Sequence, residues 1–232
     1  MFLYDTHVHT KDVSLCGVST AAEQVRKSKK MGYTGIIITD HLVKGYSKCG
    51  EHLPWEEQVR FLLSSYKAAK AEGKLCELNV FFGWEFSSWS TFPGMDILTY
   101  GLDAEFLIAH PNLFSYELEK YSRVVRKHGG YLAQAHPYRN VAAEERKRTK
   151  FPAHLLDGTE VFNGADNAEI NAIAYDYALR NNLCMQAGSD SHGVDRPTFA
   201  CGIGLEQKAE SIFDIINAIK QGKAKIVTND SE

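Results

Sequence analysis

The sequence predicts an α/β fold built on a mostly parallel sheet. Short apolar segments rich in β-branched residues alternate with longer segments of helical periodicity, an order that is typical of βαβ units. The runs 36–38 and 132–133 are apolar on both faces, as expected for strands that are buried on both sides. The chain has 232 residues, 44% of them apolar, which suggests one large domain or at most two small ones.

Strands and helices are expected in regular succession. The expected strands are 2–5, 35–39, 79–83, 96–101, 130–135, 159–162, 184–188 and 225–228. The expected helices are 20–31, 55–72, 115–128, 167–181 and 210–221, with Ser19 as the first N-cap and Glu23 in its first turn. Glycines stand where four of these helices should end, namely Gly32, Gly73, Gly129 and Gly222. The segments 42–54 and 140–152 are expected to be loops.

Composition excludes several classes of protein. Lys and Arg total 26 against 29 Asp and Glu, a net charge of −3, so the chain lacks the basic surface that general DNA coating requires. No apolar stretch reaches the roughly 18 residues of a membrane span, and no secretory leader is expected, so we expect no membrane association. The five cysteines form no CxxC pair, which favours reduced thiols and a cytoplasmic location. The oligomeric state stays open.

Histidines and carboxylates gather where the expected strands end. In a closed parallel barrel the C-terminal ends of the strands converge on one face, and active sites are built there. Residues two apart in an extended segment point the same way, so His7 and His9 can face one point, as can Asp190 and His192. The full strand-end set is His7, His9, His41, Glu85, His136, Asp190 and His192.

This mixture of imidazole and carboxylate donors suits Zn, Mn or Fe(II) better than Mg or Ca. The donors outnumber the ligands of one tetrahedral ion, so two or three divalent ions are expected. Each donor alone has an ordinary structural explanation: His41 as a hydrogen-bonded residue, or Glu85 as the partner of a basic side chain. Arg139, three residues after His136, could hold a phosphate with its planar guanidinium or simply lie on the surface.

Taken together, these motifs resemble those of the PHP (polymerase and histidinol phosphatase) family. The ordered set spans essentially the whole chain and reads His7-x-His9, Thr39-Asp40-His41, Glu85, Ala135-His136-Pro137 and Gly188-Ser189-Asp190-Ser191-His192. The resemblance implies a distorted TIM-like (β/α)7 barrel, which we expect to be a single domain over residues 1–232. It also implies metal-dependent hydrolysis of phosphoesters.

The resemblance further implies how the ligands divide among the ions. One ion is expected to bind His7, His9, Glu85 and Asp190, and a second to bind the bridging Glu85 with His136 and Asp96. A third position is expected to use His41, His192 and Asp12. Asp96 stands where many members have a histidine that opens the next strand. Many members also have a His or Asp ligand a few residues after the HxH pair. Asp12 is the first candidate for this position and Cys16 the second.

The implied reaction is attack of a metal-activated hydroxide on phosphorus, since two ions about 3.5–4 Å apart can lower the pKa of a shared water toward about 7. Glu85 and Asp190 would act as ligands, Arg139 would orient the phosphate, and His192 would protonate the leaving group. The two loops carry cations that should border the site and attract anions, namely Lys44, Lys48, His52, Arg146, Lys147, Arg148 and Lys150. We therefore expect a small phosphorylated metabolite or nucleotide, preferably a phosphomonoester, and no stable binding of duplex nucleic acid.

Two other classes stay open. An amidohydrolase acting on C–N bonds also begins with an HxH motif after its first strand, although no lysine stands at a strand end where it could form a carbamylated bridge. The alternative to an enzyme is a metal-binding module that regulates a partner. A phosphoester panel beside cyclic amides, assayed with added manganese, separates the three.

Overall fold

The computed structural model describes all residues except 45–52, 89–90, 92–93, 147, 150 and 229–232. Its strands are β1 (Phe2–Val8), β2 (Gly35–Ile38), β3 (His41–Val43), β4 (Asn79–Ser87), β5 (Asp96–Tyr100), β6 (Tyr131–Gln134), β7 (Gly158–Asn163), β8 (Cys184–Gly188), β9 (Gly202–Leu205) and β10 (Lys225–Val227). Its α-helices are α1 (Ala21–Lys30), α2 (Trp55–Cys76), α3 (Ala104–Ala109), α4 (Leu118–Lys127), α5 (Ala168–Asn181) and α6 (Ile212–Lys220). Short 3-10 helices span Leu113–Ser115 and Ala153–Leu155.

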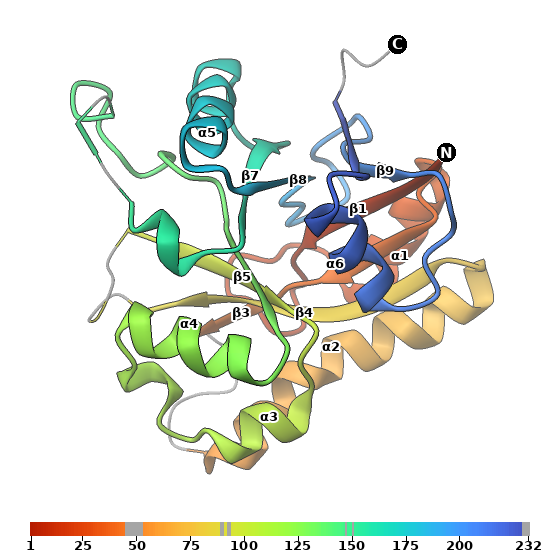
Figure 1. Ribbon diagram of the computed structural model, residues 1–232. Helices are drawn as coiled ribbons and strands as arrows, with labels where there is room; N and C mark the ends of the chain where they lie inside the picture. The colour runs from red at the N-terminus through yellow and green to blue at the C-terminus, as the bar shows by residue number, and fades with distance from the viewer. Residues whose placement is uncertain (45–52, 89–90, 92–93, 147, 150, 229–232) are drawn as a thin grey trace.

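The strands form one curved sheet, and the helices lie around it (Figure 1). The strand order is β10-β9-β1-β2-β4-β5-β6-β7-β8, with β3 paired to β4. Ser191, just after β8, forms a parallel bridge with Val8 at the end of β1, so the sheet nearly closes on itself. The predicted α/β fold with a distorted TIM-like barrel is confirmed.

The sheet is less uniformly parallel than expected, because β5 runs antiparallel to both β4 and β6. Only residues 88–95 separate β4 from β5, and a parallel crossover needs about a dozen residues or more. The reversal places Asp96, the first residue of β5, beside Ser87 at the C-terminal end of β4. A residue that opens its own strand therefore lies at the end of the barrel where its neighbours finish.

Several elements differ from the expectation. Thr20, not Ser19, is the N-cap of α1 and forms a capping box with Glu23. The helix α2 passes through Gly73 and ends three residues later. A Cβ atom at Gly73 would lie 2.7 Å from the carbonyl oxygen of Leu78, so this glycine allows close packing instead of ending the helix.

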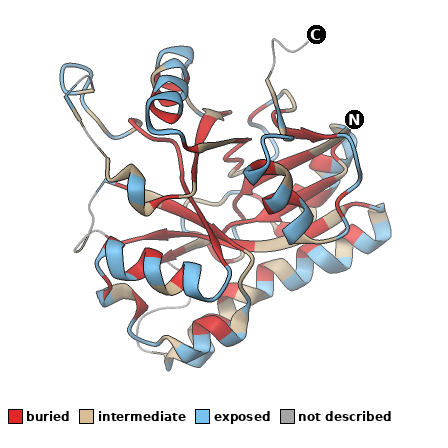
Figure 2. Ribbon diagram, in the orientation of Figure 1, coloured by how far each residue is buried: buried red, intermediate tan, exposed pale blue. Residues whose placement is uncertain are grey.

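The alternation of side chains along β4 explains why Glu85 points into the barrel. Trp84 and Phe86 face the helical layer, where the Phe86 ring stacks on Tyr121 of α4 at a centroid distance of 4.2 Å. Glu85, between them, must therefore point to the opposite side, into the barrel. Figure 2 shows the strands largely buried, with the outward faces of the surrounding helices exposed. None of the helices in the described part of the chain has the length and apolar character needed to cross a membrane.

Candidate metal centre

The C-terminal ends of the strands bring together all the predicted metal ligands except Asp12. Their donor atoms form overlapping groups in which every atom lies within 4.8 Å of the others. The groups are His7 with His9 and Glu85; His7 with His136 and Asp190; Glu85 with Asp96 and His136; and His9 with His41 and His192. We call His7, Glu85, His136 and Asp190 the deep group, and His9, His41, His192 and Cys16 the rim group.

The deep group meets the rim group through His7 and Asp190. Nε2 of His7 lies 2.9 Å from Nε2 of His9. Oδ1 of Asp190 is 3.4 Å from the first of these nitrogens and 3.3 Å from the second. This buried oxygen has no hydrogen-bond partner among the described residues. Two imidazole nitrogens and one carboxylate oxygen at such distances could together bind a cation.

Glu85 connects the two groups because its two oxygens face opposite ways. Oε1 lies 2.9 Å from Nε2 of His136, and Oε2 lies 2.9 Å from Nδ1 of His41. Burial alone would raise the pKa of Glu85, but His41 and His7 outweigh it and hold that pKa well below its usual value. The side chain is therefore an ionised carboxylate in a dry site, and it has the arrangement of a bridging ligand.

Glu160 on β7 contacts the deep group from the side away from the rim, and no sequence motif identified it. Its Oε1 lies 3.0 Å from Nδ1 of His7, and its Oε2 accepts a hydrogen bond of 2.9 Å from the backbone N–H of His136. An Nδ1–H held by a carboxylate leaves the Nε2 lone pair of His7 directed at the cluster. A Cβ atom at Gly188 would lie 2.5 Å from Cβ of His7, so only glycine leaves room for this packing. A carboxylate within the apolar strand segment 159–162 was the available signal.

Backbone conformation also marks this region. His136 and Asp190 have positive φ angles of 26° and 52°. Such conformations cost about 1–3 kcal/mol in a non-glycine residue, and they persist where the surrounding contacts determine them. Here the contacts of Glu160 and of Arg139 hold the two residues in place.

The rim group is stacked, and two of its histidines are more accessible than the deep side chains. The His9 ring lies 4.3 Å from the His41 ring and 4.4 Å from the His192 ring, measured between centroids. Side-chain exposure is 15% for His41 and 30% for His192. Burial raises the pKa of the Cys16 thiol, but hydrogen bonding with His192 and His41 outweighs it and lowers that pKa to about 5. The rim therefore offers a thiolate in addition to imidazoles.

The PHP domain family matches residues 5–216 of the sequence. The chain belongs to the PHP family. In a comparison with solved structures, a two-domain protein from Bacteroides vulgatus containing a predicted PHP-like metal-dependent phosphoesterase has a TM-score of 0.73 at 17% identity. The alignment covers 97% of this chain and 64% of that one, so this PHP chain spans less than two thirds of the relative. No curated protein matches the sequence.

Two further solved structures that share this PHP fold are named for different activities. An amidohydrolase from Chromobacterium violaceum, solved with sulfate and no metal, has a TM-score of 0.62 at 15% identity and covers 99% of both chains. A lesion-specific endonuclease from Pyrococcus furiosus has a TM-score of 0.60 at 13% identity, covering 96% of this chain and 57% of that one. These likenesses establish the fold. They lend no support to the expected exclusion of duplex nucleic acid.

Asp12 lies apart from the PHP cluster. Its Oδ2 accepts a hydrogen bond of 2.7 Å from the backbone N–H of Ala21, and it thereby stabilises the first turn of α1. Asp40 holds the turn that follows β1 and carries both Asp12 and Cys16. Its carboxylate accepts hydrogen bonds from the backbone N–H of Thr10 at 2.7 Å and from Oγ of Ser14 at 2.7 Å. This turn directs Cys16, not Asp12, toward the rim histidines.

Arg139 contacts the cluster through one of the predicted ligands. Its Nη1 donates to Oδ2 of Asp190, its Nε to Asp166 at 2.8 Å and its Nη2 to Asn163 at 2.8 Å. Burial lowers the pKa of Arg139, but Asp190 and Asp166 outweigh it and raise that pKa. Among the described residues, three of the five guanidinium N–H groups are thus used within the protein, and the other two could donate to a substrate.

The predicted cationic loops are only partly described. Lys48, His52, Lys147 and Lys150 lie outside the described residues. Arg146 donates to the carbonyl of Val141 and pairs with Glu169 of α5 at 3.2 Å. Lys44 and Arg148 are exposed.

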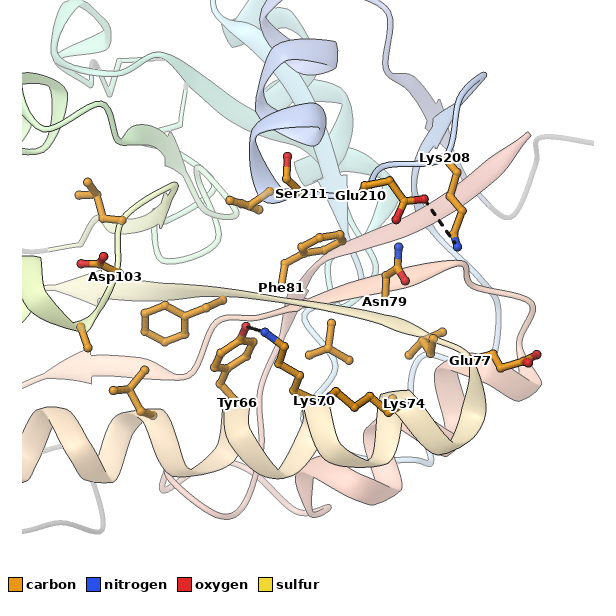
Figure 3. Close-up of a pocket in the computed structure, with 18 residues that line it drawn as sticks. Tyr66, Lys70, Lys74, Glu77, Asn79, Phe81, Asp103, Lys208, Glu210 and Ser211 are labelled. Atoms are coloured by element: carbon orange, nitrogen blue, oxygen red, sulfur yellow. Dashed lines mark hydrogen bonds and ion pairs between the residues drawn. The ribbon is translucent and has the colours of Figure 1, made fainter.

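A separate cavity of about 680 Å³ contains none of the cluster residues (Figure 3). Tyr66 and Lys70 of α2 line one side, and Glu210 and Ser211 line the other. Asn79, the first residue of β4, also lines it, so it opens near the strand end opposite Glu85. Donor chemistry, rather than the size of a hollow, locates the candidate site at the C-terminal ends.

Proposed function

We propose that this chain is a metal-dependent phosphoesterase formed by one domain over residues 1–232. The observation that carries the proposal is Glu85, an ionised carboxylate whose two oxygens lie 2.9 Å from histidines on opposite sides. His7 and Asp190 would complete one position, and His136 and Asp96 a second. His9, which the sequence assigned to the first position, also groups with His41 and His192, so these three histidines and Cys16 would form the third position, with Cys16 in the role that the sequence assigned to Asp12.

The donor set fits divalent transition metals such as Zn, Mn or Fe, because imidazole, carboxylate and thiolate are their usual ligands. Protons on the histidines balance the buried carboxylates when no metal is bound: despite its burial, His7 has a pKa well above the usual value because of Glu160, Asp190 and Glu85. When bound, the ions would lower the pKa of water and neutralise charge on the phosphoryl oxygens.

The chain's own residues would orient the substrate and move protons. Glu160 fixes the tautomer of His7. Arg139 holds a fixed positive charge beside Asp190, and its two unused N–H groups can donate to a phosphate oxygen. With the third position empty, His192 is the proposed proton donor to the leaving group, because its side chain is 30% exposed at the rim and its Nε2 is then free of metal.

We propose a small phosphorylated compound as the substrate, with phosphomonoesters ahead of internal diesters. The net charge of −3 argues against broad contact with a polyanion, so anion binding would be confined to the metal site. The endonuclease relative makes internal phosphodiester bonds of a nucleic acid the second candidate, and the amidohydrolase relative makes C–N bonds the third.

A substrate panel tests this assignment. Metal-free protein is reconstituted with Zn, Mn or Fe, the bound metal is measured by elemental analysis, and turnover is followed on phosphomonoesters, phosphodiesters, oligonucleotides and cyclic amides. We expect phosphoester turnover that disappears in Glu85→Ala and weakens in Arg139→Ala. Preferential amide hydrolysis would assign an amidohydrolase, and metal binding without turnover would indicate a regulatory module. Stronger inhibition by long duplex DNA than by free phosphate would contradict the small-substrate proposal.

A further inference from the structure

Two side chains on α1 hold the backbone of the segments that carry the rim histidines. Gln24 and Lys27 lie three residues apart, so they share one face of the helix. Gln24 is fully buried and Lys27 is half-buried. Neither belongs to the metal cluster, and neither was identified in the sequence analysis.

Gln24 joins the end of β1 to the segment that follows β8. Its Nε2 donates to the carbonyl oxygen of His9 at 2.9 Å and to that of Ser191 at 3.0 Å. Its Oε1 accepts from Oγ of Ser191 at 3.1 Å. The backbone N–H of His9 also donates to the carbonyl of Ser191 at 2.9 Å. One buried amide therefore fixes a rim ligand relative to the residue that precedes His192.

Lys27 holds the same segment on both sides of His192. Its Nζ donates to Oγ of Ser191 at 2.9 Å, to the carbonyl of Gly193 at 2.9 Å and to the carbonyl of Arg196 at 2.8 Å. An ammonium group has three donors, so these contacts use all of them. The acceptors are neutral, and removing a charge from water to bind neutral groups is unfavourable. The cost indicates that Lys27 serves to fix the geometry of residues 191–196.

We propose that Gln24 and Lys27 are positioning residues that set the separation of His9 and His192 in the rim group. The inference rests on the proposed metal-binding function. It predicts a selective effect, because the deep group has different supports. Glu160 holds His7 and His136, and Arg139 holds Asp190, whereas the α1 contacts reach the backbone of His9 and residues 191–196.

Metal titration of purified variants tests the inference directly. Lys27→Met removes the three donors and keeps the apolar length, Lys27→Arg restores donors, and Gln24→Glu replaces the amide donors by a carboxylate that can only accept when it is ionised. Lys30→Met, an exposed lysine on the same helix, is the matched control. Manganese affinity is measured for each bound ion by calorimetry and equilibrium dialysis, with circular dichroism to select folded variants.

We expect one ion per chain to bind about 10–100-fold more weakly in Lys27→Met and Gln24→Glu, while the remaining ions keep their affinity. Lys27→Arg should recover most of the loss, and Lys30→Met should match the wild type. Equal weakening of every ion, or unchanged affinity in both folded variants, would overturn the positioning role. Wild-type protein that binds no metal would instead overturn the proposed function. Absence of phosphoester turnover would leave the binding result standing.

Discussion

The deep and rim groups of the cluster use similar donors but are supported differently. The deep side chains are 0–7% exposed, and charged neighbours contact them, with Glu160 3.0 Å from His7. The rim histidines His41 and His192 are 15% and 30% exposed, and one of their partners is a cysteine. The difference indicates that the deep positions are pre-organised before metal arrives. The rim position instead depends on how the segments that carry Cys16 and His192 meet.

The comparison has a chemical consequence. Charged partners that fix ligand tautomers favour tight metal binding, because little must reorganise when the ion enters. A more exposed group held through backbone carbonyls can exchange its ion and admit substrate. We therefore expect a tightly held pair of ions and a third that binds more weakly, and the predictions below are designed to separate the two.

The largest effect is expected from Glu85→Gln, which keeps the size of the side chain and removes its charge. Both groups lose their shared carboxylate, so metal binding at both should fall by more than the roughly 100-fold that an outer partner can cause, with turnover abolished. Elemental analysis after dialysis measures the loss. Asp12→Asn is the matched control, because that carboxylate lies outside the cluster and an amide oxygen can still accept from Ala21. Retention of full metal content in Glu85→Gln would contradict the bridging role.

The second-largest effect is expected when the support of the deep group is changed. Glu160→Gln removes the charge that holds Nδ1 of His7, so the deep ions should bind about 10–100-fold more weakly, with little change at the rim. Competition with a fluorescent chelator gives the affinities of the successive ions. Glu169→Gln provides an exposed control on α5. A larger loss at the rim than in the deep group would show that the support has been assigned to the wrong side.

Local sequence patterns predicted some parts of the fold and of the site but not others. The alternating apolar segments predicted the parallel strands and hence the strand-end ligands, because their position depends on local pattern alone. The direction of β5 follows from the eight-residue separation of 88–95 rather than from its apolar pattern. The strand β3 was missed because most of it falls in the segment 42–54, which was expected to be a loop, and β9 was missed because two of its four residues are glycines.

The choice between Asp12 and Cys16 could not be made from spacing. It depends on a turn held by Asp40, whose hydrogen bonds to Thr10 and Ser14 span 30 and 26 residues of sequence. Glu160 was missed for a similar reason: its importance comes from the carboxylate's contact with His7, 153 residues away. Contacts of this length are products of the tertiary fold, and no local pattern reports them.

The third prediction concerns a change within the rim group. Cys16→Ser replaces a thiolate donor by a hydroxyl, so the weakest ion should be lost while the deep pair remains. Because the pKa of Cys16 is lowered to about 5, the thiol should react with iodoacetamide at neutral pH in metal-free protein and be protected by metal. Mass spectrometry of labelled peptides measures this, with Cys76→Ser as a control. Equal labelling with and without metal would exclude Cys16 from the rim position.

The smallest effect concerns the pH dependence of metal-free protein. Burial opposes the charged form of His7, but Glu160, Asp190 and Glu85 outweigh it and raise its pKa well above the usual value. A raised pKa contributes stability that is fully present below the unfolded value of about 6.5 and is lost as pH rises through the folded value. Metal replaces the same protons, so metal affinity rises over this range.

Thermal unfolding across that pH range should therefore show the metal-free protein losing stability as pH rises, while the difference in Tm between loaded and metal-free protein widens. The variants sharpen the comparison between the groups. Glu160→Gln removes the largest attraction on His7 and should flatten the trend, whereas Cys16→Ser should leave the contribution of His7 in place. A metal-free Tm that increases with pH would show that the histidines are neutral in the folded chain. The buried carboxylates of the deep group would then need another source of positive charge, and Arg139 is the residue placed to supply it.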